Sequence, residues 1–343
     1  MSKIKPSKGA PYARILGVGG YRPTRVVPNE VILETIDSSD EWIRSRSGIE
    51  TRHWAGPEET VAAMSIEAAG KAIADAGISA EQVGAVVVST VSHFSQTPAV
   101  ATEIADKLGT DKAAAFDISA GCAGFGYGLT LAKGMVVEGS AEYVLVIGVE
   151  RLSDLTDLED RATAFLFGDG AGAAVVGPSK EPAIGPTVWG SEGDKSETIK
   201  QTIPWDLFHF GDRSGLPLDR QGNIKFPAIT QEGQAVFRWA VFEMAKVAQQ
   251  ALDAAGISAD DLDVFIPHQA NVRIIDSMVK TLKLPEHVTV ARDVRTTGNT
   301  SAASIPLAME RLLATGEAKS GDTALVIGFG AGLVYAATVV TLP

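Results

Sequence analysis

The chain has 343 residues, of which 45% are hydrophobic and 21% charged, so it can form a sizeable core and is not a disordered chain. At about 150 residues per domain, this length predicts two domains or one large duplicated one. The single cysteine, Cys122, excludes an internal disulfide, a cysteine-cluster metal site and a mechanism with two catalytic thiols. The net charge of −12 argues against nucleic acid or an anionic membrane as a partner.

Both ends of the chain argue against export and against a membrane anchor. The first 20 residues contain Pro6 and Pro11 but no apolar run long enough for a signal peptide. Residues 323–343 carry no charge, but three glycines interrupt them. That pattern favours a strand, a glycine turn and a second strand over a membrane helix. We therefore expect a cytoplasmic protein without membrane contact.

An internal duplication organises the chain. The segment AIADAGISA at 72–80 returns as ALDAAGISA at 251–259, an offset of 179 residues. LVIG occurs at 145–148 and again at 325–328, an offset of 180. The segments GDGAGAAVV and GFGAGLVYAA share a third pattern at an offset of 160, so the first half has about 20 additional residues before it. A repeat of about 180 residues is too long for a solenoid unit and indicates two copies of one α/β half.

Each half has the same order of expected elements. A helix, a buried strand and a second strand are predicted at 65–76, 85–90 and 113–119 and again at 237–255, 264–267 and 288–291. Continuous apolar strands that alternate with helices predict an α/β protein whose sheets are covered on both faces. We expect an N-terminal half at 1–180 and a C-terminal half at 181–343. The stretch 178–235, rich in Gly, Pro, Asp and Ser, is expected to be a linker with a cap over the site.

The duplication predicts where the chemistry lies. Ligands of such sheets bind beyond the carboxyl ends of the strands. His268 directly follows a strand of the second half, and Ser89 has the equivalent place in the first. Cys122 plus 179 falls on Ser301, so the turns that contain Cys122 and Asn299 are expected to face each other. We therefore expect Cys122, His268 and Asn299 to converge.

Each of these three residues also has a purely structural interpretation. A thiol at a helix N-terminus faces free N–H groups and the positive end of the helix dipole, which should lower the pKa of Cys122 from about 8.5. A lone buried cysteine is otherwise more often an inert core residue. His268 alone fits a satisfied core histidine, and Asn299 alone fits a helix N-cap. Three separate structural roles at ends that converge are less economical than one site.

A cysteine, a histidine and an asparagine permit two kinds of thioester chemistry. A thiolate attacks a thioester and becomes acylated. In a cysteine hydrolase water then enters, and the asparagine orients the histidine. Here Asn299 comes from a turn duplicated from the cysteine turn, so we expect it to point into the pocket beside His268. Two donors aimed at one oxygen stabilise an enolate, which suits carbon–carbon bond formation by decarboxylative condensation.

The motifs AFDISAGCAGF, IPHQANVRII and TGNTSAASIP together resemble the β-ketoacyl-acyl-carrier-protein synthase III family of the thiolase superfamily. The likeness covers nearly the whole chain, from GVGGYRPTRVV and SSDEW to GFGAGL. It implies a thiolase-like fold in which two duplicated α/β halves pack as α-β-α-β-α layers. Thiolases need a second catalytic cysteine, elongating ketosynthases have a second histidine in place of Asn299, and plant-type polyketide synthases lack the SSDEW and IPHQANVR signatures.

The resemblance also implies a mechanism that starts fatty acid synthesis. Cys122 takes an acyl group from acyl-CoA, which is a substrate, so no cofactor and no metal is expected. Malonyl-acyl carrier protein then enters, and His268 and Asn299 stabilise the enolate formed as CO2 departs. The backbone N–H groups of Cys122 and Ala331 resemble the family's oxyanion hole, although most of the family has Gly at the position of Ala331.

The resemblance further implies where the two substrates bind. Trp42 and Arg161 resemble the pair that sandwiches the adenine of CoA, with Arg46 near a phosphate. Phe237 and Asn271 match positions along the pantetheine tunnel. The acidic acyl carrier protein needs a basic docking surface, for which Gln269, Arg273 and Lys280 are the candidates. Without the resemblance, a core aromatic and a solvated surface charge are the better interpretations of Trp42 and Arg46.

One position bears on the choice of primer. Thr97 aligns with a gate residue that is Phe in acetyl-specific relatives, and this segment crosses the dimer interface in the family. We expect a homodimer and, because Thr is smaller than Phe, a larger acyl pocket that accepts branched primers. Three alternatives stay open: a starter-unit ketosynthase or acyltransferase of polyketide assembly, a thioester hydrolase, and a non-catalytic dimer subunit.

Overall fold

The computed structural model describes residues 4–110, 112–212 and 214–343, and two five-stranded sheets dominate these residues. The first sheet has the strand order β1-β7-β6-β4-β5, and the second has the order β12-β11-β13-β14-β8. The strands of the first sheet are β1 (Tyr12–Tyr21), β4 (Val83–Ser89), β5 (Ala114–Ile118), β6 (Tyr143–Arg151) and β7 (Asp169–Ser179). Those of the second are β8 (Val188–Ser191), β11 (Val264–Pro267), β12 (Thr289–Val290), β13 (Thr323–Gly330) and β14 (Val334–Thr341).

The two sheets are copies of each other. In the first, β4 runs parallel to β5 and β6, whereas β7 runs antiparallel to β6 and β1. In the second, β11 runs parallel to β12 and β13, whereas β14 runs antiparallel to β13 and β8. Strands β5, β4, β6, β7 and β1 therefore correspond in order to β12, β11, β13, β14 and β8. The predicted duplication is confirmed.

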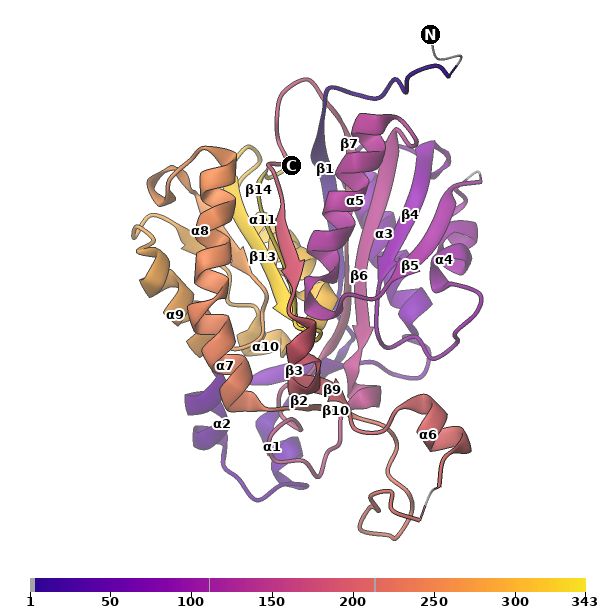
Figure 1. Ribbon diagram of the computed structural model, residues 1–343, viewed down its shortest axis with the longest axis vertical. Coiled ribbons are helices and arrows are strands. Elements are labelled where there is room, and N and C mark those ends of the chain that lie inside the picture. The colour runs from indigo at the N-terminus through magenta and orange to yellow at the C-terminus, as the bar shows by residue number, and fades with distance from the viewer. Residues whose placement is uncertain (1–3, 111, 213) are drawn as a thin grey trace.

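Helices form three layers around and between the sheets (Figure 1). The outer layer on the first sheet is α3 (Val61–Asp75) and α4 (Val100–Leu108), and that on the second is α7 (Gly233–Phe242), α8 (Met244–Ala255) and α9 (Val272–Leu282). The central layer is α5 (Gly124–Glu138) and α11 (Ser304–Thr315), whose apolar side chains share one core with inner residues of both sheets. This is the predicted α-β-α-β-α arrangement, and it is confirmed.

The predicted elements match the observed ones closely, with one correction. The single helix expected at 237–255 is two helices, α7 and α8, that meet at Glu243. Helix α8 ends as expected at Gly256, whose φ of 74° is the left-handed conformation that glycine adopts without strain. Helix α5 is largely apolar because most of it packs between the two sheets, and Phe125 and Leu129 are fully buried.

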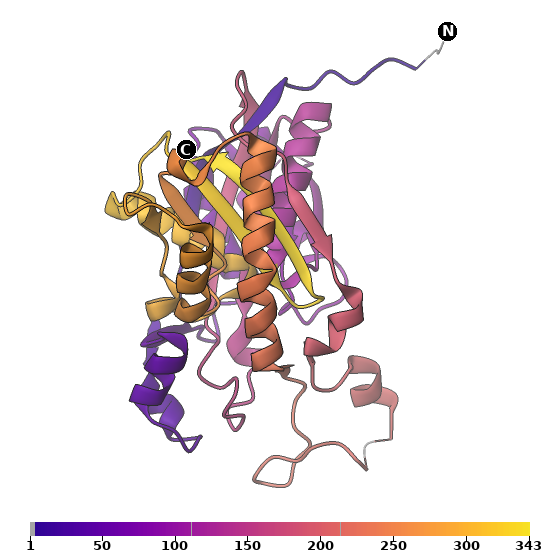
Figure 2. The same ribbon diagram turned by 60° about the vertical axis from the view of Figure 1, so that its left-hand side comes forward.

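Smaller elements gather at the end of the sheets toward which β6 and β13 point (Figure 1). They are β2 (Arg25–Pro28), α1 (Asn29–Leu33), α2 (Asp40–Ser47), β3 (Thr51–Trp54), β9 (Ile199–Gln201), α6 (Trp205–Phe210), β10 (Ile229–Gln231) and α10 (Val294–Thr297). The segment predicted as a linker and cap contains β8, β9, α6 and β10. Strands β9 and β10 pair with each other, whereas α6 projects away from the sheets (Figure 2).

The structure was also searched for membrane-spanning helices. None of the helices in the described part of the chain combines the length and the apolar character that a bilayer crossing requires.

Candidate active site

A cavity of about 530 Å³ lies at the carboxyl ends of the parallel strands, a size typical of sites for small ligands. Cys122, His268 and Asn299 all line it, together with Ala331. They come from a turn after β5, the end of β11, a turn before α11 and the turn after β13. The duplicated sheets therefore bring together three residues that are distant in sequence.

Cys122 lies in η2 (Gly121–Ala123), a single turn of 3-10 helix that precedes α5. Gly121 has a φ of 47°, which tightens the turn. Gly330 lies against the thiol, and a Cβ at Gly330 would come within 2.8 Å of the Cys122 Sγ. A side chain at Gly330 would therefore crowd the sulfur.

The protonation state of Cys122 differs from the prediction. Burial raises the pKa of the Cys122 thiol to about 12, while a hydrogen bond from Ser301 acts in the opposite direction. The expectation of a lowered pKa at a helix N-terminus is therefore wrong. The cysteine precedes the first turn of α5 and lies in a poorly solvated cavity wall. The hydration free energy that a thiolate loses there is larger than the stabilisation that the turn provides. The resting residue is a neutral thiol.

His268 leaves β11 with its backbone N–H donating to the Ile327 oxygen at 2.7 Å. Its Nδ1 lies 2.8 Å from the Ser304 Oγ, and this hydroxyl also accepts from the Gln269 N–H at 3.3 Å. Donation from this hydroxyl to Nδ1 places the ring proton on Nε2, and we assign His268 this tautomer. Burial lowers the pKa of His268 to about 3, so the ring is neutral at physiological pH. A neutral Nε2–H is a fixed donor for the cavity.

Asn299 is held as the second donor. Its Oδ1 accepts from the Ser301 N–H at 2.8 Å, so the amide Nδ2 is the atom left for the cavity. Two hydrogen bonds fix the backbone of Asn299. Its backbone N–H donates to the Leu166 oxygen at 2.8 Å, and its backbone oxygen accepts from the Gly168 N–H at 3.0 Å. The side chain is 8% exposed. The prediction that Asn299 and His268 line one pocket is confirmed.

The symmetry between the two turns corrects one residue assignment. The second turn contains η6 (Ser301–Ala303) followed by α11 from Ser304, and it matches η2 and α5 at an offset of 180. Gly121 and Ser301 share a φ of 47°, which fixes this register. The equivalent of Cys122 is therefore Ala302 rather than Ser301. Between the end of β11 and this turn, the second half has one residue more than the first half has between the end of β4 and the cysteine turn.

The expected oxyanion hole involves Cys122 and Ala331. Ala331 lies beside the cysteine turn, where its N is 3.5 Å from the position of a Cβ on Gly121, and it lines the same cavity. A methyl group at Ala331 leaves its N–H in place. The assignment of these two N–H groups to an oxyanion stays a prediction.

The residues expected to bind the adenine of CoA lie together outside the cavity. The Arg161 guanidinium carbon is 4.9 Å from the centroid of the Trp42 ring, and that of Arg46 is 6.0 Å away. Phe165 meets the Trp42 ring edge to face, with the centroids 5.5 Å apart. Two guanidinium groups therefore lie within cation–π distance of the Trp42 ring.

Neither Phe237 nor Asn271 lines the cavity, whose wall instead contains Trp239, Ala270 and Ile274. The Asn271 Oδ1 caps α9 by accepting from the Arg273 N–H at 2.8 Å, and its Nδ2 donates to the Arg46 oxygen at 3.0 Å. One amide N–H of Asn271 is left for a ligand. Its contact with pantetheine stays a prediction.

The three candidates for carrier docking separate in the structure. Arg273 and Lys280 are exposed on α9, and the Arg273 guanidinium lies 5.2 Å from the Phe237 ring centroid. Gln269, in contrast, is fully buried, with its Nε2 donating to the Pro267 oxygen at 2.7 Å and the Ala291 oxygen at 3.3 Å. The prediction that Gln269 contacts the carrier protein is therefore wrong.

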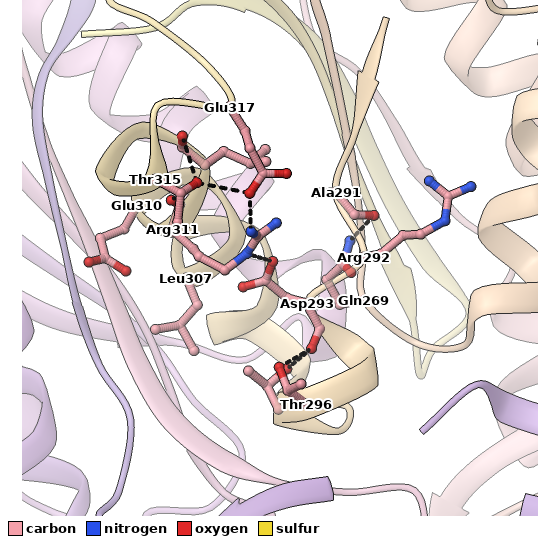
Figure 3. A network of polar contacts seen from close by, with 12 residues as sticks. Gln269, Ala291, Arg292, Asp293, Thr296, Leu307, Glu310, Arg311, Thr315 and Glu317 are labelled. Carbon is pink, nitrogen blue, oxygen red and sulfur yellow. Dashed lines mark hydrogen bonds and ion pairs between the residues drawn. The ribbon is translucent and has the colours of Figure 1, made fainter. Parts of the chain in front are cut away.

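Gln269 belongs instead to a buried polar network beneath the site (Figure 3). Its Oε1 accepts from the Val294 N–H at 3.3 Å, next to Asp293. The Asp293 carboxylate pairs with Arg311 at 2.6 Å and Arg22 at 3.3 Å. Arg22 belongs to the first half, so this network fastens the second turn to the other half.

Thr97 lies in the loop after β4, where it is exposed. Its neighbours Ser95 and Gln96 line the cavity of their own chain, but Thr97 does not. Its role as a gate for the cavity of a second subunit stays a prediction.

Three buried polar residues near the site were not predicted to take part in it. Ser304 and Glu150 lie in segments with the pattern of ordinary core, a helix start and a strand end. Ser301 was identified only as a repeat position. Among the described residues, no group of three or more His, Cys, Asp or Glu side chains is placed to hold a metal ion.

Two family profiles match the chain. The profile described as 3-Oxoacyl-[acyl-carrier-protein (ACP)] synthase III matches residues 116–193. The profile for the C terminal part of the same synthase matches residues 252–342. Cys122 lies in the first range, and His268 and Asn299 lie in the second.

Whole-chain relatives agree with the profiles. The chain is 92% identical over 343 residues to beta-ketoacyl-[acyl-carrier-protein] synthase III 1 of Streptomyces coelicolor, with 100% of both chains covered. It is 52% identical over 343 residues to the mycobacterial beta-ketoacyl-[acyl-carrier-protein] synthase III of Mycobacterium marinum, covering 100% of this chain and 99% of the relative. Its structure matches the priming β-ketosynthase of the R1128 polyketide pathway with a TM-score of 0.93 at 44% identity, covering 100% and 99% of the two chains. The chain is thus an acyltransferase that belongs to the β-ketoacyl-acyl-carrier-protein synthase III family of thiolase-like condensing enzymes.

Proposed function

We propose that Cys122 is the nucleophile of this condensing enzyme and that His268 and Asn299 are its enolate-stabilising donors. The observation that carries the proposal is the convergence in one cavity of a thiol and two N–H donors whose orientations are fixed from behind. The reaction is the decarboxylative condensation of an acyl-CoA primer with malonyl-acyl carrier protein, which initiates fatty acid synthesis.

The first half-reaction is transfer of the acyl group to Cys122. The sulfur bonds to the acyl carbon, the bond from that carbon to the CoA sulfur breaks, and CoA leaves as a thiol with the proton of Cys122. The Cys122 and Ala331 N–H groups are the donors for the oxyanion of the tetrahedral intermediate.

The second half-reaction is condensation. Malonyl-acyl carrier protein loses CO2, and the electron pair of the broken bond forms an enolate whose oxygen accepts from the His268 Nε2–H and the Asn299 Nδ2–H. The enolate carbon bonds to the acyl carbon, the bond to the Cys122 sulfur breaks, and the thiolate takes up a proton. Because His268 is neutral, it stabilises the enolate as a hydrogen-bond donor without supplying a charge.

The primer enters with its CoA held at the rim. Trp42 and Arg161 bind the adenine, Arg46 binds a phosphate, and pantetheine passes Phe237 and Asn271 toward the thiol. The acyl end then meets the apolar side chains that line the cavity, among them Leu152, Leu155 and Phe167.

The carrier protein docks on the exposed face of α9. Arg273 and Lys280 lie seven residues apart on this helix and share one face. They supply local positive charge on a chain with a net charge of −12, which an acidic partner requires.

We expect a homodimer in the cytoplasm, where CoA thioesters and carrier protein are made. The loop that contains Thr97 also contains Phe94, which is 44% exposed and meets Trp205 and Phe226 edge to face. Phe226 is 48% exposed, so an aromatic surface adjoins the gate position. A second copy on this surface would cover these rings and bring Thr97 to its partner's cavity.

Thr97 then determines the primer. Because Thr leaves more room than Phe, branched acyl-CoA primers should react at least as well as acetyl-CoA. The matched variant is Thr97→Phe, which should shift the ratio of kcat/KM values toward acetyl-CoA. A wild-type enzyme that strongly prefers acetyl-CoA over every branched primer contradicts this part of the proposal.

A starter-unit ketosynthase of polyketide assembly is the second candidate, because the R1128 priming β-ketosynthase has the same fold over the whole chain. The two candidates share the chemistry and differ in the carrier protein. Condensation rates with fatty-acid and polyketide carrier proteins, measured side by side, distinguish them.

The decisive experiment is intact mass spectrometry of the enzyme after exposure to a panel of acyl-CoA primers. One acyl adduct on Cys122, converted to a stoichiometric ketoacyl product by malonyl-acyl carrier protein, is the expected result. Free acid in place of the ketoacyl product indicates a thioester hydrolase. No adduct with any primer overturns the mechanism.

A further inference from the structure

A short hairpin, residues 217–225, lies in the segment that was expected to be a linker and cap. Its arms meet at a bridge between Leu218 and Ile224, and the Asp219 carboxylate closes its tip by accepting from two backbone N–H groups. None of the described residues that line the cavity belongs to this cap hairpin. The mechanism above therefore gives an ordered element no role.

Lys225 fastens the cap hairpin to the loop between β6 and β7, residues 152–168, which carries Arg161. Its Nζ lies 2.6 Å from the Asp157 carboxylate and 3.0 Å from the Glu159 carboxylate. The three side chains are 23%, 24% and 26% exposed, so water and salt screen these pairs less than pairs on the open surface. The hydrogen bond to Asp157 raises the pKa of Lys225, which is therefore charged at neutral pH.

Arg220 connects the cap hairpin to both segments of the proposed adenine site. Its Nε lies 3.3 Å from the Glu159 carboxylate, and its guanidinium also donates to the Thr35 oxygen at 2.8 Å. Thr35 lies just before α2, which carries Trp42, whereas Glu159 lies in the β6–β7 loop, which carries Arg161. The cap hairpin thus bridges the two segments whose side chains meet at the Trp42 ring.

The β6–β7 loop is acidic, although the substrate proposed to bind it is a polyanion. The acids that precede Arg161 in this loop are Asp154, Asp157, Glu159 and Asp160. Arg151 pairs with the first of them at 3.0 Å, and the Ala162 N–H donates to the last at 2.9 Å. For the middle two, the ion-pair partners among the described residues are Lys225 and Arg220.

These ion pairs leave the Arg161 guanidinium available. Arg161 is exposed, and it forms no ion pair with any residue that the structure describes. Glu159 lies two residues before it in the chain. Without Lys225, the Asp157 and Glu159 carboxylates would compete with the nucleotide for Arg161 and would repel the pyrophosphate and ribose phosphate of CoA.

We propose that Lys225 is a positioning residue for the nucleotide end of CoA. It holds Asp157 and Glu159 away from Arg161, and it fixes the β6–β7 loop against the hairpin that also contacts the segment before α2. It touches neither the substrate nor the reacting atoms. This inference rests on the proposed binding of the CoA adenine at Trp42 and Arg161.

The test compares two primers in Lys225→Met. One is acyl-CoA, and the other is acyl-pantetheine, which carries the same thioester without the nucleotide and its phosphates. With acyl-CoA, kcat/KM for acylation should fall about 5- to 20-fold through a higher KM, because the lost interaction contributes equally to the ground state and the transition state. With acyl-pantetheine, kcat/KM should stay within about twofold of the wild-type value, since the fold and Cys122 are intact. Equal loss with both primers overturns the proposal.

Further variants separate positioning from direct contact with CoA. Asp157→Asn and Glu159→Gln, added together to Lys225→Met, remove the two charges that the lysine neutralises. The value of kcat/KM for acyl-CoA should then return to within about threefold of wild type. Without this recovery Lys225 acts on CoA itself, and the positioning role is wrong.

The conservative variant Lys225→Arg tests the role of the charge. A guanidinium can pair with both carboxylates, so this variant should keep the wild-type preference for acyl-CoA over acyl-pantetheine. A Lys225→Arg enzyme that uses acyl-CoA as poorly as Lys225→Met contradicts the proposal.

Lys246→Met is the matched control, because it removes the same charge and an exposed pair with Glu243 at the start of α8. It should leave both kcat/KM values nearly unchanged. A loss with acyl-CoA as large as that in Lys225→Met would be an effect of net charge and would overturn the proposal.

The wild-type enzyme separates failure of this inference from failure of the proposed function. The acyl adduct on wild-type Cys122 is measured first, and its absence removes the proposed function. A wild-type enzyme that uses acyl-CoA and acyl-pantetheine equally well removes the adenine site and this inference with it. If the wild type prefers acyl-CoA and Lys225→Met keeps the same preference, this inference alone is wrong.

Discussion

The two strand-to-helix turns that face the cavity have the same backbone and opposite chemistry. The first, Gly121–Ala123, carries the thiol, and the second, Ser301–Ala303, follows the amide donor Asn299. Gly121 and Ser301 share a left-handed φ, and both turns lead into a helix of the central layer. The difference shows that one scaffold occurs twice in the chain, with the cysteine in one copy and with His268 and Asn299 in the other.

The comparison extends to the strand ends. His268 follows β11, and its equivalent after β4 is Ser89, whose hydroxyl has no hydrogen-bond partner in the structure. The second half therefore has a donor held by Ser304, where the first half has a small neutral side chain.

The largest effect is expected at the equivalent positions Cys122 and Ala302. Cys122→Ala should reduce acylation by at least about 1,000-fold, the scale for loss of a nucleophile. Adding Ala302→Cys should not restore it, because Ala302 is buried and does not line the cavity. Mass spectrometry with acyl-CoA measures both. An adduct on a cysteine at position 302 would show that the turns are interchangeable.

His268→Ala should slow condensation much more than acylation. Condensation of the acyl-enzyme should fall about 100- to 1,000-fold, since removal of an oxyanion donor has that scale. Acylation should change less than about fivefold, because neutral His268 holds no proton for it. Single-turnover kinetics of each step decide the matter, and a larger loss in acylation contradicts the assignment.

Asp293→Asn should loosen the second turn more than the first. The carboxylate lies between Arg22 and Arg311 and is 3% exposed, so its loss takes one carboxylate partner from each of two half-buried cations, which keep Glu310 and Glu317 respectively. We expect about 2–4 kcal/mol lower free energy of unfolding, measured in urea. Asp276→Asn, which removes an exposed pair with Arg292, is the matched control and should cost less than about 1 kcal/mol.

Arg273→Glu should affect the carrier protein and spare CoA. We expect kcat/KM for malonyl-acyl carrier protein to fall about tenfold, because an acidic partner meets a reversed charge. Acylation by acyl-CoA should stay near the wild-type rate. Lys107→Glu, on α4 of the other half, is the control for net charge and should leave both rates nearly unchanged. Equal loss in both half-reactions counts against docking on α9.

The smallest expected effect is the pH dependence of stability that His268 causes. The pKa of His268 is about 3 in the folded state and about 6.5 in the unfolded state. Its contribution to the free energy of unfolding is therefore fully present above pH 6.5 and is lost as the pH falls from 6.5 toward 3. Between pH 7.5 and 5.5 this amounts to about 1 kcal/mol. Urea unfolding of the wild type and His268→Gln at both pH values measures it. The same slope in both proteins would place the titration elsewhere.

The sequence was sufficient to predict the fold and the convergence of Cys122, His268 and Asn299 in one cavity. The repeated AIADAGISA and LVIG segments established the duplication, and strand ends then located Cys122, His268 and Asn299. It misplaced Gln269, because a polar residue after a strand looks exposed until its partners, backbone oxygens from other segments, are known. It missed Glu150 for the same reason. Burial and hydrogen bonding of a single polar side chain depend on contacts across the fold, which no local pattern records.

The central position of α5 has a consequence for synthesis of the chain. Phe125 and Leu129 are fully buried, but part of the surface that covers α5 is β13 and β14, which begin at Thr323. That surface leaves the ribosome about 180 residues after α5 does, or roughly 10–40 s later at ~5–20 residues per second. During this interval the nascent first half exposes an apolar, glycine-rich helix. Folding of this enzyme on the ribosome therefore depends on protection of α5 until the last two strands arrive.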